Sequence, residues 1–342
     1  MAVTQGSPAS SAHEAVLYIY SRHIFAQGDG AFYRPGIQSK FGRVNNGEIE
    51  FWHELKFNNW GFRDDVDFRE RGDASEIRIV ALGDSFTANL DAPIPWPQML
   101  EKRLRKEFGP ALKVYNLGLT GAGPLNWIGL EERVRRIAPD IILMPFYTGI
   151  MERPKIRFSE DGNEGRFYCR YSFPFLLKRP VGIVDARFPD IPPHELLGFA
   201  RELQQETTAS AGQARIGSLN LVPRLLNCAY RRQRGMSWVM GASQAAVSKM
   251  RAWAPHIILG QFPAQADFVV QGAPGIQEQF LAGLARERKL PLLDFRLLIR
   301  DYDVAALYTS TSNHFNEQGN MAVAGIFLEE ILPLCQKIKK GV

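Results

Sequence analysis

The stretch Arg78–Thr87, with the sequence RIVALGDSFT, decides the fold class. Its apolar run Ile79–Leu82 is short and ends at a glycine and an aspartate, which favour turns. This pattern predicts a buried strand followed by a turn. Ser85 would then project its hydroxyl beyond the carboxyl end of the strand, where ligands bind in parallel sheets. Gly-Asp-Ser is also an ordinary turn sequence, so this stretch by itself does not establish catalysis.

Similar apolar runs recur along the chain and alternate with helix-length segments. Buried strands that alternate with helices are typical of a parallel sheet covered on both faces. The sequence therefore predicts an α/β fold, a three-layer sandwich around a flavodoxin-like parallel sheet of about five strands. The expected strands are 77–82, 113–117, 140–146, 256–262 and 292–295, and the expected helices are 96–108, 126–138, 243–254, 275–288 and 316–332.

Two regions depart from this alternation. Residues 1–75 are interpreted as an N-terminal extension, with a short amphipathic helix over 13–26 and short strands near 48–52. Within the α/β domain, 76–342, the proline-rich segment 151–242 is interpreted as an insertion that covers the active face. Helices are expected in this insertion near 194–210 and 217–233.

Composition restricts the class of protein. The chain has 342 residues, of which 45% are hydrophobic, so it can bury a large core and is not intrinsically disordered. A net charge of +5 raises the question of nucleic acid, but the basic residues form short clusters in helix-like stretches. Such clusters are more typical of solvated helix faces, and no nucleic-acid partner is predicted.

No cofactor, metal or membrane span is predicted. The 3 cysteines are scattered, and the 6 histidines show neither an HxH nor an HExxH spacing. No run of 18 apolar residues is present, and the first residues lack the basic and apolar regions of a signal peptide. A cytoplasmic location is therefore expected, with loss of a targeting segment left open as an alternative. The oligomeric state is also left open.

Two further motifs fall where the predicted sheet would bring them together. Asn116–Gly123, NLGLTGAG, follows the second strand and does not match the dinucleotide-binding fingerprint. A backbone N–H at Gly121 could serve an oxyanion there. His314 lies before the last helix and could act as a general base, although a lone histidine is more often structural. The combination with Ser85 favours a catalytic role.

In these three motifs the chain resembles the SGNH/GDSL hydrolase superfamily, over roughly residues 56–333. The resemblance implies that Ser85 is the nucleophile, that His314 is the base, and that the N–H groups of Ser85 and Gly121 form the oxyanion hole. Asn59–Asp64, NWGFRD, also resembles a segment that precedes the serine motif in a bacterial branch of the superfamily.

The chain departs from the family pattern at two places. Gly149 stands where an asparagine normally donates to the oxyanion, and Thr311 and Ser312 stand where an aspartate normally precedes the histidine. Losing one oxyanion donor typically costs about 10²–10³ in rate and losing the acid about 10⁴, so substitutes are expected in an active enzyme.

The expected substitutes are of three kinds. A backbone carbonyl could orient His314, which would make a Ser–His dyad, and Asn126 or Asn89 could donate to the oxyanion. An acid could also come from elsewhere in the sequence, and the candidates are Asp294, Asp301 and Asp303. Aspartates at such positions are more often found at a strand end or in a solvated loop without a catalytic role. The full set of supporting or substrate-binding candidates is Asp84, Asn126, Gly149, Arg153, Thr311 and Ser312.

These features predict serine-dependent acyl-ester chemistry. The acyl group on Ser85 would pass to water, as in an esterase or deacylase, or to another hydroxyl, as in an O-acyltransferase. The expected substrate is a small-molecule or carbohydrate-like ester. Basic residues of the insertion could bind an anionic substrate. Alternatively they are ordinary solvated surface residues. They are Arg153, Lys155, Arg157 and Arg166. The alternative function is a binding protein of the same fold that has lost catalysis.

Overall fold

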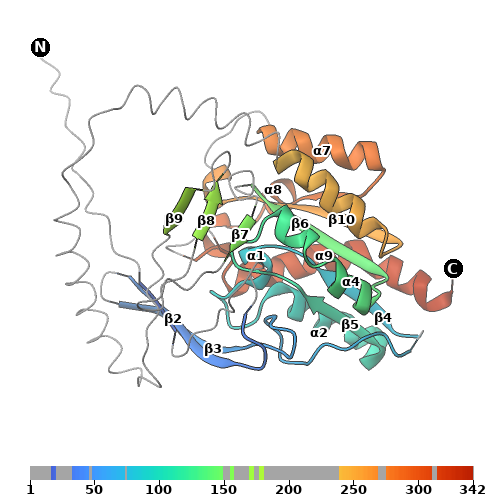
Figure 1. The fold of residues 1–342 in the computed structure, drawn as a ribbon, viewed down its shortest axis with the longest axis horizontal. Coiled ribbons are helices and arrows are strands. Elements are labelled where there is room, and N and C mark those ends of the chain that lie inside the picture. Colours follow the sequence, from blue (N-terminus) through green and yellow to red (C-terminus); the bar gives the residue numbers. More distant parts are fainter. Residues whose placement is uncertain are drawn as a thin grey trace, which may run out of the picture.

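The computed structural model places most of the residues that it describes in one α/β arrangement, with an additional sheet formed by the N-terminal part (Figure 1). The residues that it describes are 17–20, 33–45, 48–73, 75–148, 155–157, 169–172, 177–180, 239–268, 275–309 and 314–341.

The central sheet has five parallel strands, as predicted. They are β4 (Ile77–Ala81), β5 (Leu112–Asn116), β6 (Ile141–Tyr147), β10 (His256–Phe262) and β11 (Leu292–Asp294). Their spatial order is β11-β10-β6-β4-β5. Numbered along the chain this is the 2-1-3-4-5 order of flavodoxin-like sheets, in which ligands bind where the winding direction reverses, beside the first strand. That first strand is β4, which leads to Ser85.

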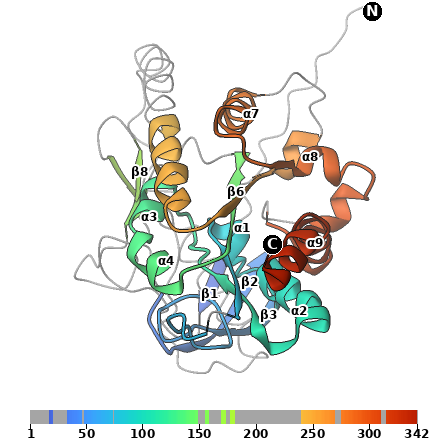
Figure 2. The same ribbon diagram turned by 90° about the vertical axis from the view of Figure 1, so that its right-hand side faces the viewer.

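Helices cover both faces of this sheet, and Figure 2 shows the sheet between them. One face carries α2 (Trp96–Phe108), α8 (Phe295–Leu298) and α9 (Glu317–Lys340). The other carries α3 (Pro124–Ile128), α4 (Glu131–Ile137), a helix over 239–251 and α7 (Ile276–Arg288). The three-layer α/β architecture is therefore confirmed. Short 3-10 turns join the elements: η1 (Gly109–Ala111), η3 (Gln265–Phe268) and η4 (Val304–Leu307).

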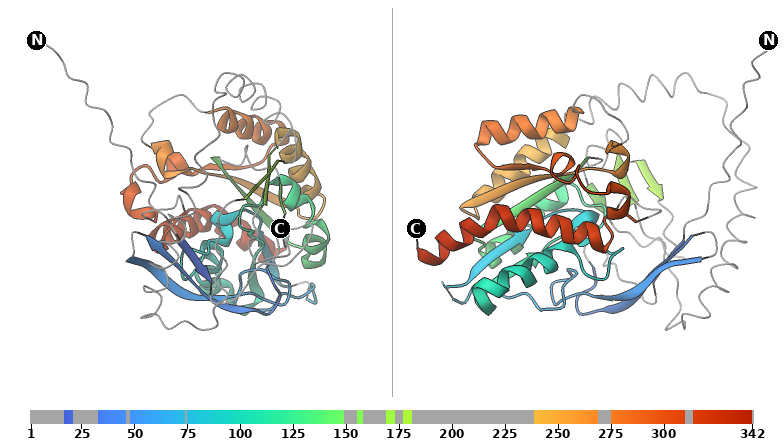
Figure 3. Two further views of the ribbon diagram at one scale, coloured as in Figure 1. Left: turned by 60° about the vertical axis from the view of Figure 1, so that its left-hand side comes forward. Right: turned by 180° about the vertical axis from the view of Figure 1, so that it is seen from behind.

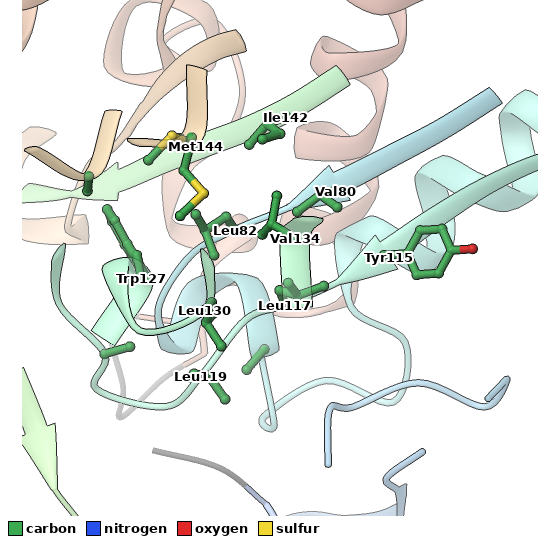
Figure 4. Close-up of a cluster of buried hydrophobic side chains, with 14 of the residues drawn as sticks. Val80, Leu82, Tyr115, Leu117, Leu119, Trp127, Leu130, Val134, Ile142 and Met144 are labelled. Atoms are coloured by element: carbon green, nitrogen blue, oxygen red, sulfur yellow. The ribbon is translucent and has the colours of Figure 1, made fainter. Parts of the chain in front are cut away.

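Strand β4 is buried on both faces, which explains its lack of polar alternation. Ile77 and Ile79 pack toward the side of α2 and α9. Val80 and Leu82 point the other way, into the cluster with Leu130 that Figure 4 shows. This packing fixes the end of the strand, and with it the position of the serine turn.

Two expected helices have different bounds in the structure. The segment expected at 126–138 divides into α3 and α4, and Gly129, a poor helix former, lies at the division. The last helix was expected to stop before Pro333, but α9 continues through it to Lys340. A proline inside a helix is unfavourable. The turn beyond it nevertheless buries Cys335 in the core, and this packing favours continuation.

The N-terminal sheet is antiparallel and consists of β1 (Leu17–Tyr20), β2 (Gln38–Asn45) and β3 (Glu48–Lys56). The strand expected near 48–52 is therefore present and longer. The amphipathic helix expected over 13–26 is wrong at Leu17–Tyr20, which pairs with β2 as a strand. Aromatic and β-branched residues suit a strand, and pairing overrides a weak helical pattern. Figure 3 shows this sheet near the end of the central sheet where α1 (Ser85–Ala88) begins.

Within 151–242 the structure describes a small antiparallel sheet of β7 (Lys155–Arg157), β8 (Cys169–Ser172) and β9 (Leu177–Pro180). The helices expected near 194–210 and 217–233 lie outside the described residues. In the described part of the chain, no helix combines the length and apolar character needed to cross a membrane.

Candidate active site

Ser85 is the first residue of α1 and follows β4 after a short turn. The Asp84 side chain caps this helix, because its Oδ1 accepts the N–H of Phe86 at 3.0 Å. Asp84 therefore shapes the serine turn. The first N–H groups of a helix, here including that of Ser85, have no acceptor within the helix and can face an anion. Ser85 itself is largely buried, at 4% exposure.

His314 lies directly beside this serine, although 229 positions separate them in the sequence. Its Nε2 is 2.9 Å from Ser85 Oγ. The imidazole packs edge-on against the ring of Phe86, with the ring centroids 5.1 Å apart. The loop is held by a bridge between Tyr308 and Phe315 and by the Thr309 N–H, which donates to the His314 carbonyl at 3.0 Å.

The histidine has an acidic partner that the sequence analysis missed. His314 Nδ1 is 2.8 Å from Asp91 Oδ2, and the Asp91 side chain is only 4% exposed. A carboxylate can only accept, so Nδ1 carries the proton and Nε2 is left to accept from the Ser85 hydroxyl. The expectation of a Ser–His dyad is therefore corrected, because an aspartate occupies the position that orients the base.

The candidate acids from the sequence lie elsewhere. Asp294 caps α8, with its Oδ1 accepting from Arg296 N–H, and Asp303 precedes η4. Asp301 is 87% exposed beside Arg300. Thr311 and Ser312 lie outside the described residues.

The acid comes instead from a loop six positions after the nucleophile. No residue pattern in the sequence marks it, because the chain turns back at Asn89 after a helix of only four residues, and only this turn brings an acid two positions later near the helix start.

The N-terminal extension stabilises the loop that carries Asp91 through hydrogen bonds. The buried Arg63 guanidinium donates to the carbonyl oxygens of Ala88, Asn89, Ala92 and Pro93. Asn89 adopts a left-handed conformation, with φ of 34°, and its amide donates to the Phe315 carbonyl at 2.8 Å. Asn89 thus joins the acid loop to the histidine loop.

The loop after β5 carries Gly121, whose N–H is the backbone donor expected from the sequence. Gly121 has φ of +71°, a left-handed conformation that favours glycine. Gly118 lies so close to α1 that an added Cβ would come within 2.2 Å of the Ala88 nitrogen. Tyr33 of the extension supports the loop, because its hydroxyl accepts the Thr120 N–H at 3.0 Å and lies 2.6 Å from Thr120 Oγ1.

The remaining candidates are only partly described. The Asn126 side-chain oxygen accepts the Gly123 N–H at 3.1 Å, so this residue stabilises the start of α3. Gly149, Arg153 and Arg166 lie outside the described residues, and the side chains of Lys155 and Arg157 are not described. In the described ranges, no group of three or more histidine, cysteine, aspartate or glutamate side chains could hold a metal ion.

Side chains of the extension contact the acid and the loop that carries it. Arg43 Nη1 lies 3.2 Å from Asp91 Oδ2, and Arg43 also pairs with Glu50. The distance from His53 Nε2 to the Leu90 carbonyl oxygen is 2.8 Å. Burial, assisted by the charge of Arg63, lowers the pKa of His53 to about 4, so this histidine is neutral near pH 7.

Comparison with known proteins gives distant structural similarity. No family model and no curated protein matches the chain. An acetyl xylan esterase is 14% identical over 75% of this chain and 100% of its own, with a TM-score of 0.43. A lipase/acylhydrolase from Enterococcus faecalis is 14% identical over 75% of this chain and 95% of its own, with a TM-score of 0.40.

A member of the lipolytic protein G-D-S-L family from Veillonella parvula is 14% identical over 74% of this chain and 97% of its own, also with a TM-score of 0.40. At this distance the likeness says nothing of activity, and the function has to be inferred from the geometry of the site.

Proposed function

We propose that the chain is a serine ester hydrolase or acyltransferase whose catalytic residues are Ser85, His314 and Asp91. The observation that carries this proposal is the continuous line of contacts from Ser85 Oγ to His314 Nε2 at 2.9 Å and from His314 Nδ1 to Asp91 Oδ2 at 2.8 Å. A nucleophile, a base and an orienting acid in this order are the requirements of nucleophilic acyl transfer.

In the first half-reaction Ser85 Oγ attacks the ester carbonyl carbon while His314 Nε2 takes the hydroxyl proton. The carbonyl π electrons move to its oxygen, and the N–H groups of Ser85 and Gly121 stabilise the resulting oxyanion. Asp91 stabilises the imidazolium. When the tetrahedral intermediate collapses, the C–O bond to the alcohol breaks, and His314 returns the proton to the leaving oxygen. The product is an acyl ester on Ser85.

In the second half-reaction a hydroxyl attacks this ester, and His314 takes its proton and passes it to Ser85 Oγ. Water as acceptor gives an esterase, whereas an alcohol gives an O-acyltransferase. The expected substrate is a small-molecule or carbohydrate-like ester. The alternative of a binding protein without catalysis depended on two departures from the family pattern, the absent acid and the absent oxyanion asparagine, and Asp91 removes the first of these reasons.

The test uses a short-chain aryl acetate and a fluorophosphonate probe with wild-type protein, Ser85→Ala and His314→Ala. We expect release of the aryl alcohol and one mass adduct on the Ser85 peptide, both abolished in Ser85→Ala. Ser75→Ala, which removes an exposed hydroxyl, is the matched control. Adding a sugar or glycerol and measuring acetylated alcohol separates transfer from hydrolysis. Absence of both turnover and Ser85 labelling in folded wild-type protein would favour the binding protein.

A further inference from the structure

The N-terminal sheet contributes a positive charge to the histidine–acid pair. The side chain of Arg43, on β2, is fully buried and lies 3.2 Å through Nη1 from Asp91 Oδ2. His314 Nδ1 approaches the same oxygen at 2.8 Å. One carboxylate oxygen therefore meets a permanent cation and the base at the same time. Since guanidinium stays protonated at all ordinary pH values, this cation is constant.

We infer that Arg43 is a positioning residue that keeps the Asp91–His314 pair ready to accept the serine proton, and that Glu50 moderates its charge. This inference rests on the proposed function only for its consequence in catalysis; the charge effect itself is independent of turnover.

An irregularity in the β2–β3 pairing places Arg43 and Glu50 together. The pairing of β2 with β3 shifts by one residue between Arg43 and Val44, so that Arg43 pairs with Phe51 and Val44 with Ile49. Glu50 is the additional residue, as in a β-bulge, a feature that often redirects side chains near active sites. The Arg43 guanidinium lies over the Phe51 ring, 5.0 Å from its centroid, and pairs with Glu50.

The sign of the effect follows from electrostatics. A proton added to the Asp91–His314 pair places positive charge near the Arg43 cation, which opposes it. Arg43 therefore keeps the pair unprotonated to lower pH, and a neutral imidazole is what a general base requires. Glu50 offsets part of the Arg43 charge and acts in the opposite direction. Removing either residue should thus move the titration of the pair, and the two shifts should have opposite signs.

The other charged groups around the pair do not titrate in the same range. His53 faces the acid loop from β3, and burial lowers its pKa to about 4. Arg63 faces the same loop from the extension, and burial lowers its pKa to about 10, so it stays cationic near neutral pH. Asp84 faces the serine turn from the start of α1. These groups are common to all variants and do not reverse the predicted signs.

The experiment measures the titration of His314 in the full-length chain by NMR of histidine labelled with ¹⁵N, with the signal assigned by its loss in His314→Gln. The acid limb of kcat/KM for the aryl acetate is recorded in parallel. We expect Arg43→Met to raise the midpoint by about one pH unit and Glu50→Gln to lower it by about half a unit. Arg43→Lys, which keeps the charge, should return the midpoint toward that of the wild type.

Lys40→Met on β2 and Glu54→Gln on β3 are the matched controls, and both midpoints should stay at the wild-type value. If Arg43→Met does not fold, Glu50→Gln still decides, because it retains Arg43. A midpoint that is unchanged in Glu50→Gln or in folded Arg43→Met, or that shifts in the same direction in both, would overturn the inference. The NMR result stands even if no ester is turned over, so failure of the proposed function is recognised separately, by the absence of Ser85-dependent activity.

Discussion

At the scale of single residues, the site depends on side chains that the sequence places far apart. Ser85 and His314 could be predicted because each lies in a motif at the edge of a predicted strand or helix. Asp91 could not, because its role depends on a loop that folds back toward the base. A single aspartate in such a loop looks like an ordinary surface residue until the fold is known. In the structure it is buried, with 4% of its side chain exposed.

A prediction at this scale concerns Gly118. An alanine Cβ at this position would come within 2.2 Å of the Ala88 nitrogen. Gly118→Ala must therefore displace either the loop after β5 or helix α1. We expect kcat/KM for the aryl acetate to fall at least about 10-fold, because small misplacements at a catalytic centre are costly. Gly241→Ala is the control, since nothing lies within 4 Å of the added Cβ and the position is helical. Equal activity in the two variants would show that the contact is not needed.

At the scale of elements, the parallel order of β4, β5 and β6 explains why the serine turn after β4 and the loop after β5 meet. Their carboxyl ends lie at one edge, so each loop begins next to the others. This part of the fold was predictable, because short apolar runs recur along the chain and alternate with helix-length segments. The β1 strand was not, since Leu17–Tyr20 acquires its structure by pairing with residues that follow more than twenty positions later.

A prediction at this scale tests whether Tyr33 of the extension supports the loop after β5. Tyr33→Phe removes the hydroxyl that accepts the Thr120 N–H, which leaves that group without its partner. An unpaired donor costs about 1–3 kcal/mol where it is fully buried. Thr120 is half-buried, so a cost at the lower end of this range is expected on the loop next to Gly121. We expect kcat to decrease about 10-fold while the KM stays within about twofold. Steady-state kinetics of Tyr33→Phe and of the exposed Tyr302→Phe would decide, and a normal kcat in Tyr33→Phe would contradict it.

At the scale of the whole molecule, the extension and the α/β domain share one hydrophobic core. Tyr33, Phe41 and Leu55 belong to the same buried cluster as Val80 and Leu82. The sequence analysis separated residues 1–75 as an extension by their composition, which gave no sign of their contacts with the site. Composition shows where regular alternation ends, whereas the contacts of Arg43 and Arg63 with the acid loop exist only in the folded chain.

A stability prediction follows from His53. Burial lowers its pKa from 6.5 to about 4, so the unfolded chain binds a proton at this position before the folded chain does. The free energy of unfolding should therefore decrease by at most about 3 kcal/mol as the pH falls from about 6.5 to 4. In His53→Gln, which does not titrate, the free energy of unfolding should fall less across this window. Urea denaturation at pH 7.5 and 4.5 would measure this, with His256→Gln as control; an unchanged pH dependence would contradict it.

The central claim is that Asp91 completes the catalytic group, and its most direct test is the rate at which a fluorophosphonate inactivates Asp91→Asn. An amide can no longer stabilise the imidazolium or hold Nδ1 as the protonated nitrogen, so the second-order rate constant at pH 7.5 should fall by about 10³–10⁴. Asp303→Asn, an exposed aspartate from the sequence candidates, should react at the wild-type rate. If folded Asp91→Asn is inactivated as fast as the wild type, Asp91 does not serve as the acid.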